Sequence, residues 1–193
     1  KIADYYFGRG IDFMLVQDFT EAINSFDRTI EIDPNYTLAY FNRAAVRYKQ
    51  MEYELSNTAQ DELADAMSIK FGHGAKQQPS PLTQQVATDK EKRAYLYEMI
   101  IRDYSVVIQQ DPSFSFAYFN RAGMRCLQRD YKAAIIDYNE AIRRNEEFAE
   151  AWFNRGLARL SQGDATRGIA DLSKAGELGI INAYSIIKRM TSE

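Results

Sequence analysis

The sequence predicts an all-α fold built from four stacked helical hairpins. Three observations support this prediction: a short aromatic–arginine motif recurs with a period of 34 residues, an apolar stripe at helical spacing follows each copy, and turn residues are scarce. Only 4 prolines and 10 glycines occur among 193 residues, fewer than a fold of many short strands needs. Because one helical hairpin cannot bury its own apolar face, consecutive hairpins stack and cover one another.

The recurring motif marks the first helix of each predicted hairpin. Its four copies are Tyr6-Phe7-Gly8-Arg9, Tyr40-Phe41-Asn42-Arg43, Tyr118-Phe119-Asn120-Arg121 and Trp152-Phe153-Asn154-Arg155. The first two copies are 34 residues apart, as are the last two, whereas 78 residues separate the middle pair, which is one period and an insertion of 44. We therefore expect a single domain, 1–193, with repeat 1 at 3–36, repeat 2 at 37–114 including the insertion within about 54–97, repeat 3 at 115–148, repeat 4 at 149–182 and a capping helix at 183–193.

The second helix of each hairpin has its own signals. In repeat 1 its apolar residues are four positions apart, which places them on one helical face: Ala22, Phe26 and Ile30. An acidic residue stands between the two halves of every repeat, where an aspartate can accept hydrogen bonds from the free N–H groups of a helix start: Asp18, Glu52, Asp130 and Asp164. Proline cannot continue a helix, so two of the second helices should end at Asp33-Pro34 and Asp111-Pro112.

These positions resemble the tetratricopeptide repeat (TPR) family, whose 34-residue pattern is an aromatic followed by Leu-Gly, then Tyr, Ala, Phe and Pro. The sequence matches at the first aromatic, the small residue, the alanine, the second aromatic and, twice, the proline. It departs where the family has leucine, because arginine stands there in every repeat: Arg9, Arg43, Arg121 and Arg155. The resemblance implies an α-solenoid, a right-handed superhelix of stacked hairpins whose first helices line a concave groove.

The arginine column needs partners, because an unpaired buried charge is costly. Counted without the insertion, repeats 2, 3 and 4 have an aspartate sixteen residues after the arginine, whereas repeat 1 has Ser25: the aspartates are Asp103, Asp137 and Asp171. We interpret the pattern as an arginine–aspartate bridge between the two helices of a repeat. The alternative is that the arginines bind a carboxylate of a ligand.

The insertion interrupts repeat 2. A Gln/Ser-rich stretch predicts a mobile loop at 71–87, because its turn residues arrive together: Gly72, Gly74, Pro79 and Pro81. We expect helix over most of Tyr53 to Lys70, and a return helix that starts at the capping box of Thr88 and Glu91. Together they would form a helical arm; the alternative is an excursion without contacts. His73 lies in the loop without a second potential ligand nearby, so we assign it no chemistry.

The TPR resemblance implies that the second, fifth, sixth, ninth and twelfth positions of each repeat face the groove. The candidate ligand-binding residues at these positions are Phe7, Ile11, Phe41, Asn42, Tyr48, Phe119, Asn120, Phe153, Asn154 and Leu157. Exposed together, such side chains exceed the usual apolar patch of a soluble monomer, which predicts binding of an apolar helix or an extended peptide. The asparagine amides could pair with peptide backbone. Two alternatives stay open: the phenylalanines pack between neighbouring helices, and the asparagines bridge to a neighbouring helix.

One activity of the family is disfavoured. TPR domains that bind the acidic C-termini of heat-shock chaperones use a clamp of Lys, Asn, Asn, Lys and Arg. The corresponding positions here match once and offer no cation: Phe7, Ile11, Asn42, Phe116 and Asn120. A terminal carboxylate would therefore be buried without a partner.

Composition excludes or disfavours several classes of partner and of function. The net charge of -3 and the absence of a basic stripe disfavour nucleic acid and anionic membranes as partners. Cys126 is the only cysteine, which excludes an intramolecular disulfide and a thiolate zinc site. No catalytic motif, metal cluster or cofactor motif is visible, so we predict a non-catalytic, soluble protein-interaction scaffold with a protein or peptide partner. A self-association module, filled by another copy or its own arm, and a regulatory domain are the alternatives. The start at Lys1 without a signal-like segment indicates a piece of a longer protein, cytoplasmic or periplasmic.

Overall fold

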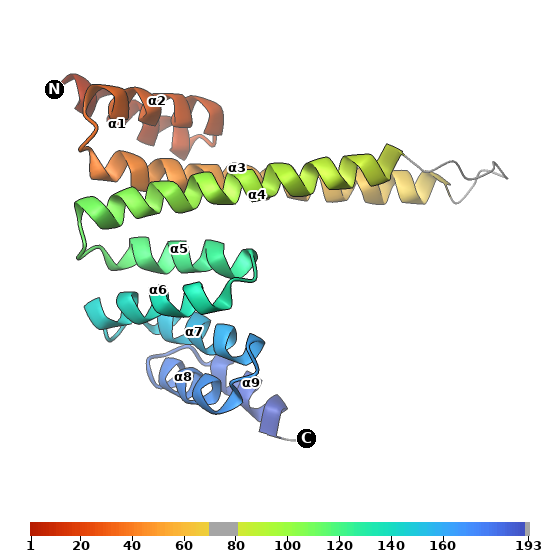
Figure 1. The fold of residues 1–193 in the computed structure, drawn as a ribbon. Helices are drawn as coiled ribbons and strands as arrows, with labels where there is room; N and C mark the ends of the chain where they lie inside the picture. The colour runs from red at the N-terminus through yellow and green to blue at the C-terminus, as the bar shows by residue number, and fades with distance from the viewer. Residues whose placement is uncertain (70–80, 192–193) are drawn as a thin grey trace. The chain divides into compact units, whose positions relative to one another are not determined.

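The structure is a computed structural model, which describes the backbone of residues 1–69 and 81–191 and the side chains of residues 1–57 and 90–191. The described residues form nine α-helices and no strand, which confirms the predicted all-α fold (Figure 1). The helices are α1 (Ile2–Leu15), α2 (Phe19–Ile32), α3 (Thr37–Ile69), α4 (Pro81–Gln110), α5 (Ser115–Leu127), α6 (Tyr131–Arg144), α7 (Ala149–Ser161), α8 (Ala165–Glu177) and α9 (Asn182–Thr191).

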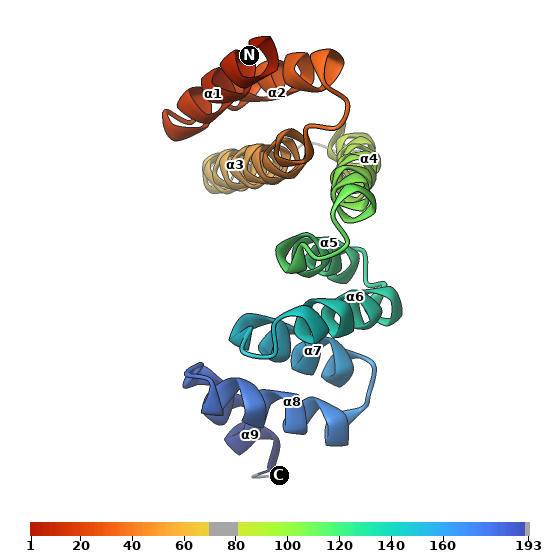
Figure 2. The same cartoon turned by 90° about the vertical axis from the view of Figure 1, so that its left-hand side faces the viewer.

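The chain divides into two compact units, Lys1–Ile100 and Ile101–Glu193, and the boundary falls inside α4. In unit 1, α1 and α2 pack against each other as a hairpin, and α3 packs on α2 (Figure 2). In unit 2, the pairs α5–α6 and α7–α8 are hairpins, α7 packs on α6, and α9 packs on α8. From α1 to α3 and from α5 to α9, each helix therefore packs on the next one in the sequence.

The three short hairpins turn in the same way. The residue two positions before each second helix has a positive φ, the left-handed conformation that reverses the chain: Gln17 at 62°, Arg129 at 62° and Gly163 at 84°. An aspartate follows, and its Oδ1 accepts a hydrogen bond from the backbone N–H three residues later: Asp18 at 3.2 Å, Asp130 at 3.1 Å and Asp164 at 3.2 Å. The caps predicted at these three aspartates are confirmed.

Repeat 2 has no such turn. Met51 is buried at the place of the turn residue, and α3 continues through it to Ile69 without interruption. The predicted helix after Tyr53 is therefore confirmed as part of α3. Glu52, grouped in the sequence with the capping aspartates, lies inside this helix and accepts a 2.5 Å hydrogen bond from Tyr48 Oη.

The return helix starts earlier than the capping box predicts. α4 begins at Pro81, so the prediction of a loop is wrong for 81–87, and Thr88 lies within the helix instead of at its start. Proline suits a first helical turn because the missing N–H has no helical partner there. The rest of the predicted loop, 71–80, lies outside the described residues. Within the described part, Lys92 Nζ of α4 lies 3.2 Å from Glu54 Oε2 of α3.

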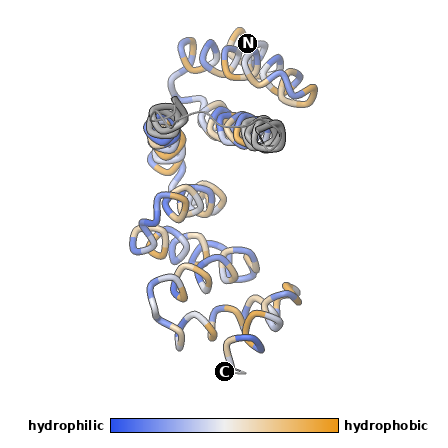
Figure 3. The backbone as a smooth tube through the Cα atoms, turned by 90° about the vertical axis from the view of Figure 1, so that its right-hand side faces the viewer, coloured by the Kyte–Doolittle hydropathy of each residue, from blue (hydrophilic) through white to orange (hydrophobic). Residues whose placement is uncertain are grey.

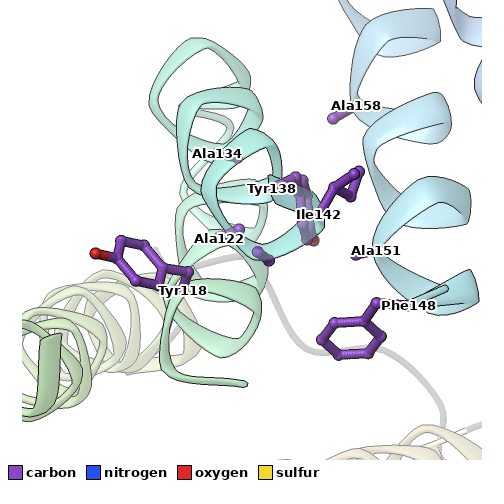
Figure 4. Close-up of a cluster of buried hydrophobic side chains, with 9 residues drawn as sticks. Tyr118, Ala122, Ala134, Tyr138, Ile142, Phe148, Ala151 and Ala158 are labelled. Atoms are coloured by element: carbon purple, nitrogen blue, oxygen red, sulfur yellow. The ribbon is translucent and has the colours of Figure 1, made fainter. Parts of the chain in front are cut away.

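The cores of the units lie between the helices of each hairpin. The tube of the short helices alternates between hydrophilic and hydrophobic segments, as expected where each helix buries one face (Figure 3). In unit 1, Phe26 is fully buried against Gly10, whose missing Cβ would lie 2.5 Å from the ring. In unit 2, Tyr138 and Ile142 of α6 point toward α7, where Ala151 and Ala158 leave room for them (Figure 4).

The last helix covers the end of unit 2. Ala183 is fully buried, and Ile186 and Ile187 pack against the cluster that contains Leu172. A Cβ on Gly176 would lie 2.5 Å from the Tyr184 ring, so this ring covers the end of α8. Lys188 and Arg189 are exposed, so α9 buries one face against α8 and leaves its basic side chains on the surface.

Candidate functional site

Two buried arginine–aspartate pairs hold the hairpins of unit 2 together. Arg121 of α5 donates from Nε and Nη2 to Asp137 of α6, at 2.9 and 2.7 Å. Arg155 of α7 makes the same two bonds to Asp171 of α8, at the same distances. Both carboxylates are buried, and both pairs were expected from the sixteen-residue spacing. The two pairs confirm the structural interpretation of the arginine column in repeats 3 and 4.

The sequence interpretation missed a second arginine, one helical turn after the first. Arg125 Nη1 donates to Asp137 at 2.9 Å, and Arg159 Nη1 donates to Asp171 at 2.8 Å. The sequence does contain a pattern that predicts this second arginine, because Arg-x-x-x-Arg recurs in repeats 2, 3 and 4, starting at Arg43, Arg121 and Arg155. Each aspartate therefore accepts three charge-assisted hydrogen bonds, the kind that contributes most to rigidity.

The same arginines also reach back to the preceding helix. Arg121 Nη1 donates to Ser105 Oγ of α4 at 2.9 Å, and Arg155 Nη1 donates to Asn139 Oδ1 of α6 at 2.8 Å. In unit 1, Arg43 Nη1 donates to Asp27 Oδ1 of α2 at 2.6 Å, which is the equivalent contact. The bridge from Arg43 to Asp103, a residue of the other unit, stays a prediction. Because Arg121 and Arg155 each bond the helix before and the helix after their own, they hold α5 and α7 of unit 2 in place.

These fixed helices leave a cavity of about 250 Å³ between α5, α6 and α7. It is lined by Gly123, Cys126, Tyr131, Tyr138, Asn154, Leu157, Ala158 and Ser161. Gly123 opens the cavity, because a Cβ added there meets no atom within 4 Å. The lining includes no charged side chain, so the cavity suits an uncharged group.

The polar groups of the cavity are held neutral. Burial raises the pKa of Tyr138 well above its usual range, with the nearby Cys126 adding to the effect. Burial also raises the pKa of the Cys126 thiol, against a smaller opposite effect of the Tyr138 hydroxyl, which lies 3.9 Å from the sulfur. Both groups are therefore protonated at neutral pH and can serve as uncharged hydrogen-bond partners.

The structure places the predicted residues of unit 2 in two settings. Asn154 and Leu157 line the cavity. Phe119 instead packs between helices, with its ring centroid 4.7 Å from that of Phe148 and 5.8 Å from that of Tyr138, and Phe153 packs against the cluster around Leu172. Asn120 is half-buried on α5. Phe119 and Phe153 therefore contact neighbouring helices in this unit, and their role in ligand binding stays a prediction.

The predicted residues of unit 1 are engaged within the unit. Phe7 stacks on Tyr36 at 4.9 Å and lies in one cluster with Ile11. Asn42 Nδ2 donates to the Leu38 carbonyl of its own helix at 2.8 Å, and Phe41 is half-buried. Burial and the hydrogen bond to Glu52 raise the pKa of Tyr48 to about 12. Unit 1 therefore offers these side chains to a ligand only in part.

The cavity contains residues that the repeat positions did not predict. Tyr131 and Tyr138 belong to second helices, and Ser161 ends α7. The sequence carried one signal for the cavity, since the ninth repeat position is glycine only in repeat 3, at Gly123. A glycine where other repeats have a larger side chain indicates a gap on that helix face. The sequence does not show which residues line the rest of the gap, because this depends on how α6 packs.

Comparisons with known proteins agree with this arrangement. Residues 127–178 match the family model of the tetratricopeptide repeat. The part of the chain from 127 to 178 is therefore similar to the tetratricopeptide repeat. No curated protein matches its sequence. None of the described helices is long and apolar enough to cross a membrane.

Solved structures share the TPR fold. A crystal structure of MamA is 18% identical, with a TM-score of 0.63 over 91% of this chain and 78% of that one. MamA 41-end from Desulfovibrio magneticus RS-1 is 14% identical, with a TM-score of 0.64 over 91% of this chain and 75% of that one. The Arabidopsis OM64 TPR domain is 14% identical, with a TM-score of 0.57 over 82% of this chain and 95% of that one. At these identities the likeness shows the fold alone.

Proposed function

We propose that this TPR protein is a non-catalytic interaction scaffold, and that unit 2 binds an apolar segment of a protein partner over α5 and α7. The cavity at Gly123 carries the proposal, because it is uncharged, open and lined by first-helix residues from two repeats. An apolar or aromatic side chain of the partner fills it. The buried arginine–aspartate pairs keep the cavity formed before the partner arrives, which lowers the entropic cost of binding.

The face of α5 around the cavity supports a peptide ligand. Phe116, Asn120, Gly123 and Leu127 are spaced by four, three and four residues, so they share one helical face. Phe116 is 54% exposed and Leu127 is 47% exposed, which leaves apolar surface at both ends of this face. Asn154, Leu157 and Ser161 of α7 also share one helical face, because they are spaced by three and then four residues. Apolar contacts supply affinity, and the Asn120 and Asn154 amides pair with backbone groups of the partner.

The test is a peptide selection followed by a cavity-filling substitution. Peptides selected from a random displayed library on the wild-type protein should bind through an apolar or aromatic anchor residue. Gly123→Leu fills the cavity and should weaken their binding at least about tenfold, since one buried apolar anchor contributes well over 1.4 kcal/mol. Ala170→Leu is the matched control, because Ala170 is exposed on α8 of the same unit and does not line the cavity. Equal affinities for both variants would contradict the proposal.

A second copy of the chain is the competing occupant. α9 and the residue before it leave apolar side chains exposed at the end of unit 2, with Ile181 at 78%, Tyr184 at 48% and Met190 at 39%. Sedimentation over a hundredfold concentration range separates the two cases. Self-association that Gly123→Leu abolishes and Ala170→Leu leaves intact would assign the cavity to another copy. If the protein is a monomer at all concentrations, the occupant of the cavity is a different protein.

A further inference from the structure

Unit 1 has a groove that the repeat pattern alone does not create. It has a volume of about 450 Å³ and lies between the α1–α2 turn and α3. Its lining residues are Val16, Gln17, Asp18, Phe19, Thr20, Gln50, Tyr53 and Glu54. The groove exists because α3 does not turn at Met51, so Tyr53 and Glu54 stand opposite the α1–α2 turn.

The groove combines exposed apolar surface with negative charge. Val16 is 73% exposed and Tyr53 is 58% exposed, and the Tyr53 ring meets Phe19 edge-on at 6.2 Å between centroids. Two of the eight lining residues are carboxylates, Asp18 and Glu54, and none is cationic. A ligand that matches this lining has an apolar part and a positive charge.

The carboxylates differ in how they are already bonded. Asp18 uses Oδ1 to cap α2, and its Oδ2 accepts no hydrogen bond from a described side chain. Glu54 pairs with Lys92, but both side chains are well exposed, at 45% and 64%. An exposed ion pair of this kind is weak and exchanges readily with another cation.

The end of α1 contributes a negative pole to the groove, while Asp18 offsets the positive pole at the start of α2. The C-terminal end of a helix carries the negative pole of its dipole, which basic side chains usually offset. α5 and α7, which occupy the same place in their repeats, have Arg125 and Arg159 in the last turn. α1 has no basic residue in its last turn. No basic side chain of α1 itself therefore offsets the negative pole beside Val16 and Gln17.

We infer that this groove binds an arginine side chain carried by an apolar segment of a protein partner. The guanidinium lies against the Tyr53 ring and bonds Asp18 and Glu54, while flanking apolar residues cover Val16 and Phe19. Arginine suits this site better than lysine because its planar group can stack on an aromatic ring and donate to two carboxylates together. The site lies within unit 1 and does not depend on the cavity of unit 2.

The experiment uses a short acetylated and amidated probe peptide, Leu-Gly-Arg-Gly-Leu, titrated into the protein and followed by NMR. Citrulline, the neutral isostere of arginine, replaces the arginine in the control peptide. The arginine peptide should shift the amide signals of Val16–Thr20 and Gln50–Glu54, and the citrulline peptide should bind at least about tenfold more weakly. Raising the salt concentration should weaken only the arginine peptide.

Variants of the protein give the decisive comparison. Tyr53→Ala should weaken the arginine peptide about fivefold or more, whereas Tyr95→Ala, an equally exposed tyrosine of the same unit at 65%, should not. Glu54→Gln should weaken binding because it removes one of the two carboxylates that bond the guanidinium. Equal binding of the citrulline peptide, equal effects of the two tyrosine variants, or no binding at millimolar peptide would each overturn the inference.

Discussion

Replacing Asp171 by asparagine should destabilise unit 2 by about 3 kcal/mol. Asp171 is 2% exposed and accepts hydrogen bonds from Arg155 Nε, Arg155 Nη2 and Arg159 Nη1, at 2.9, 2.7 and 2.8 Å. Asparagine keeps the shape but removes the charge, and its NH₂ group faces arginine donors. Two buried guanidiniums then lose their counter-ion.

The magnitude follows from the burial of the pair. Removing one partner of a buried ion pair costs about 3–5 kcal/mol. The Arg155 and Arg159 side chains are 10% and 15% exposed, so water reaches them in part and the low end of that range applies. For a chain of this size, about 3 kcal/mol corresponds to a fall in Tm of roughly 6–12 °C.

Trp152 provides the assay, because it is the only tryptophan and lies on α7, beside Arg155. Urea unfolding followed by its fluorescence reports on unit 2 without contributions from unit 1. Glu177→Gln is the control on the same helix, since the exposed pair of Lys174 and Glu177 contributes less than about 1 kcal/mol. A cost below about 1 kcal/mol for Asp171→Asn, or equal costs for the two variants, would refute the stabilising role of the network.

Three further predictions follow from backbone geometry and from the single thiol. Gly10→Ala should lower the unfolding free energy by about 2 kcal/mol, because its Cβ would meet the buried Phe26 ring. Gly8→Ala should raise it by up to about 1 kcal/mol, because the space around its Cβ is open and alanine favours the helix. Urea unfolding followed by circular dichroism measures both changes. The turn residues Arg129 and Gly163 both have positive φ, which glycine adopts without strain. Arg129→Gly should therefore raise the unfolding free energy by about 1 kcal/mol, and Gly163→Ala should lower it by a similar amount. Urea unfolding followed by Trp152 fluorescence measures both changes. Cys126 should react with iodoacetamide more slowly than a cysteine peptide at pH 8, because its raised pKa leaves less thiolate, and unfolding in urea should remove the difference.

Much of the fold could be predicted from the sequence because its signals are local. The capping aspartates, the sixteen-residue Arg–Asp spacing and the apolar stripes each depend on residues within one hairpin. The uninterrupted α3 also had a local signal. Repeats 1, 3 and 4 have an αL turn residue followed by aspartate, whereas Met51 and Glu52 favour continued helix.

Where prediction failed, two local signals competed. Pro81 reads as a loop residue in a Gln/Ser-rich stretch, yet proline is also favoured in the first turn of a helix, and the structure has it there. The capping box at Thr88 was then a coincidence of spacing inside a helix. The spacing of Thr88 and Glu91 does not show whether the residues before Thr88 are helical. The sequence therefore could not distinguish a helix that starts at Pro81 from one that starts at Thr88.

The candidate site was less predictable because it is defined by packing. Repeat positions identify Asn154 and Leu157 as groove residues, but they also select Phe119 and Phe153, which pack between helices. Tyr138 closes the cavity from a second helix and carries no mark in the sequence that separates it from other core aromatics. The groove at Tyr53 depends on where α3 fails to turn, which a repeat alignment treats as an insertion.

The most direct test of the proposed function is the alkylation rate of Cys126 in the presence of a selected peptide. Cys126 is the only cysteine and lines the cavity, so iodoacetamide reports on cavity occupancy without any labelling of the partner. A saturating peptide should slow alkylation at least about tenfold in the wild type and in Ala170→Leu, because the bound anchor excludes the reagent. A peptide that binds with full affinity while Cys126 reacts at its unliganded rate would contradict the account, since the partner would then occupy another surface.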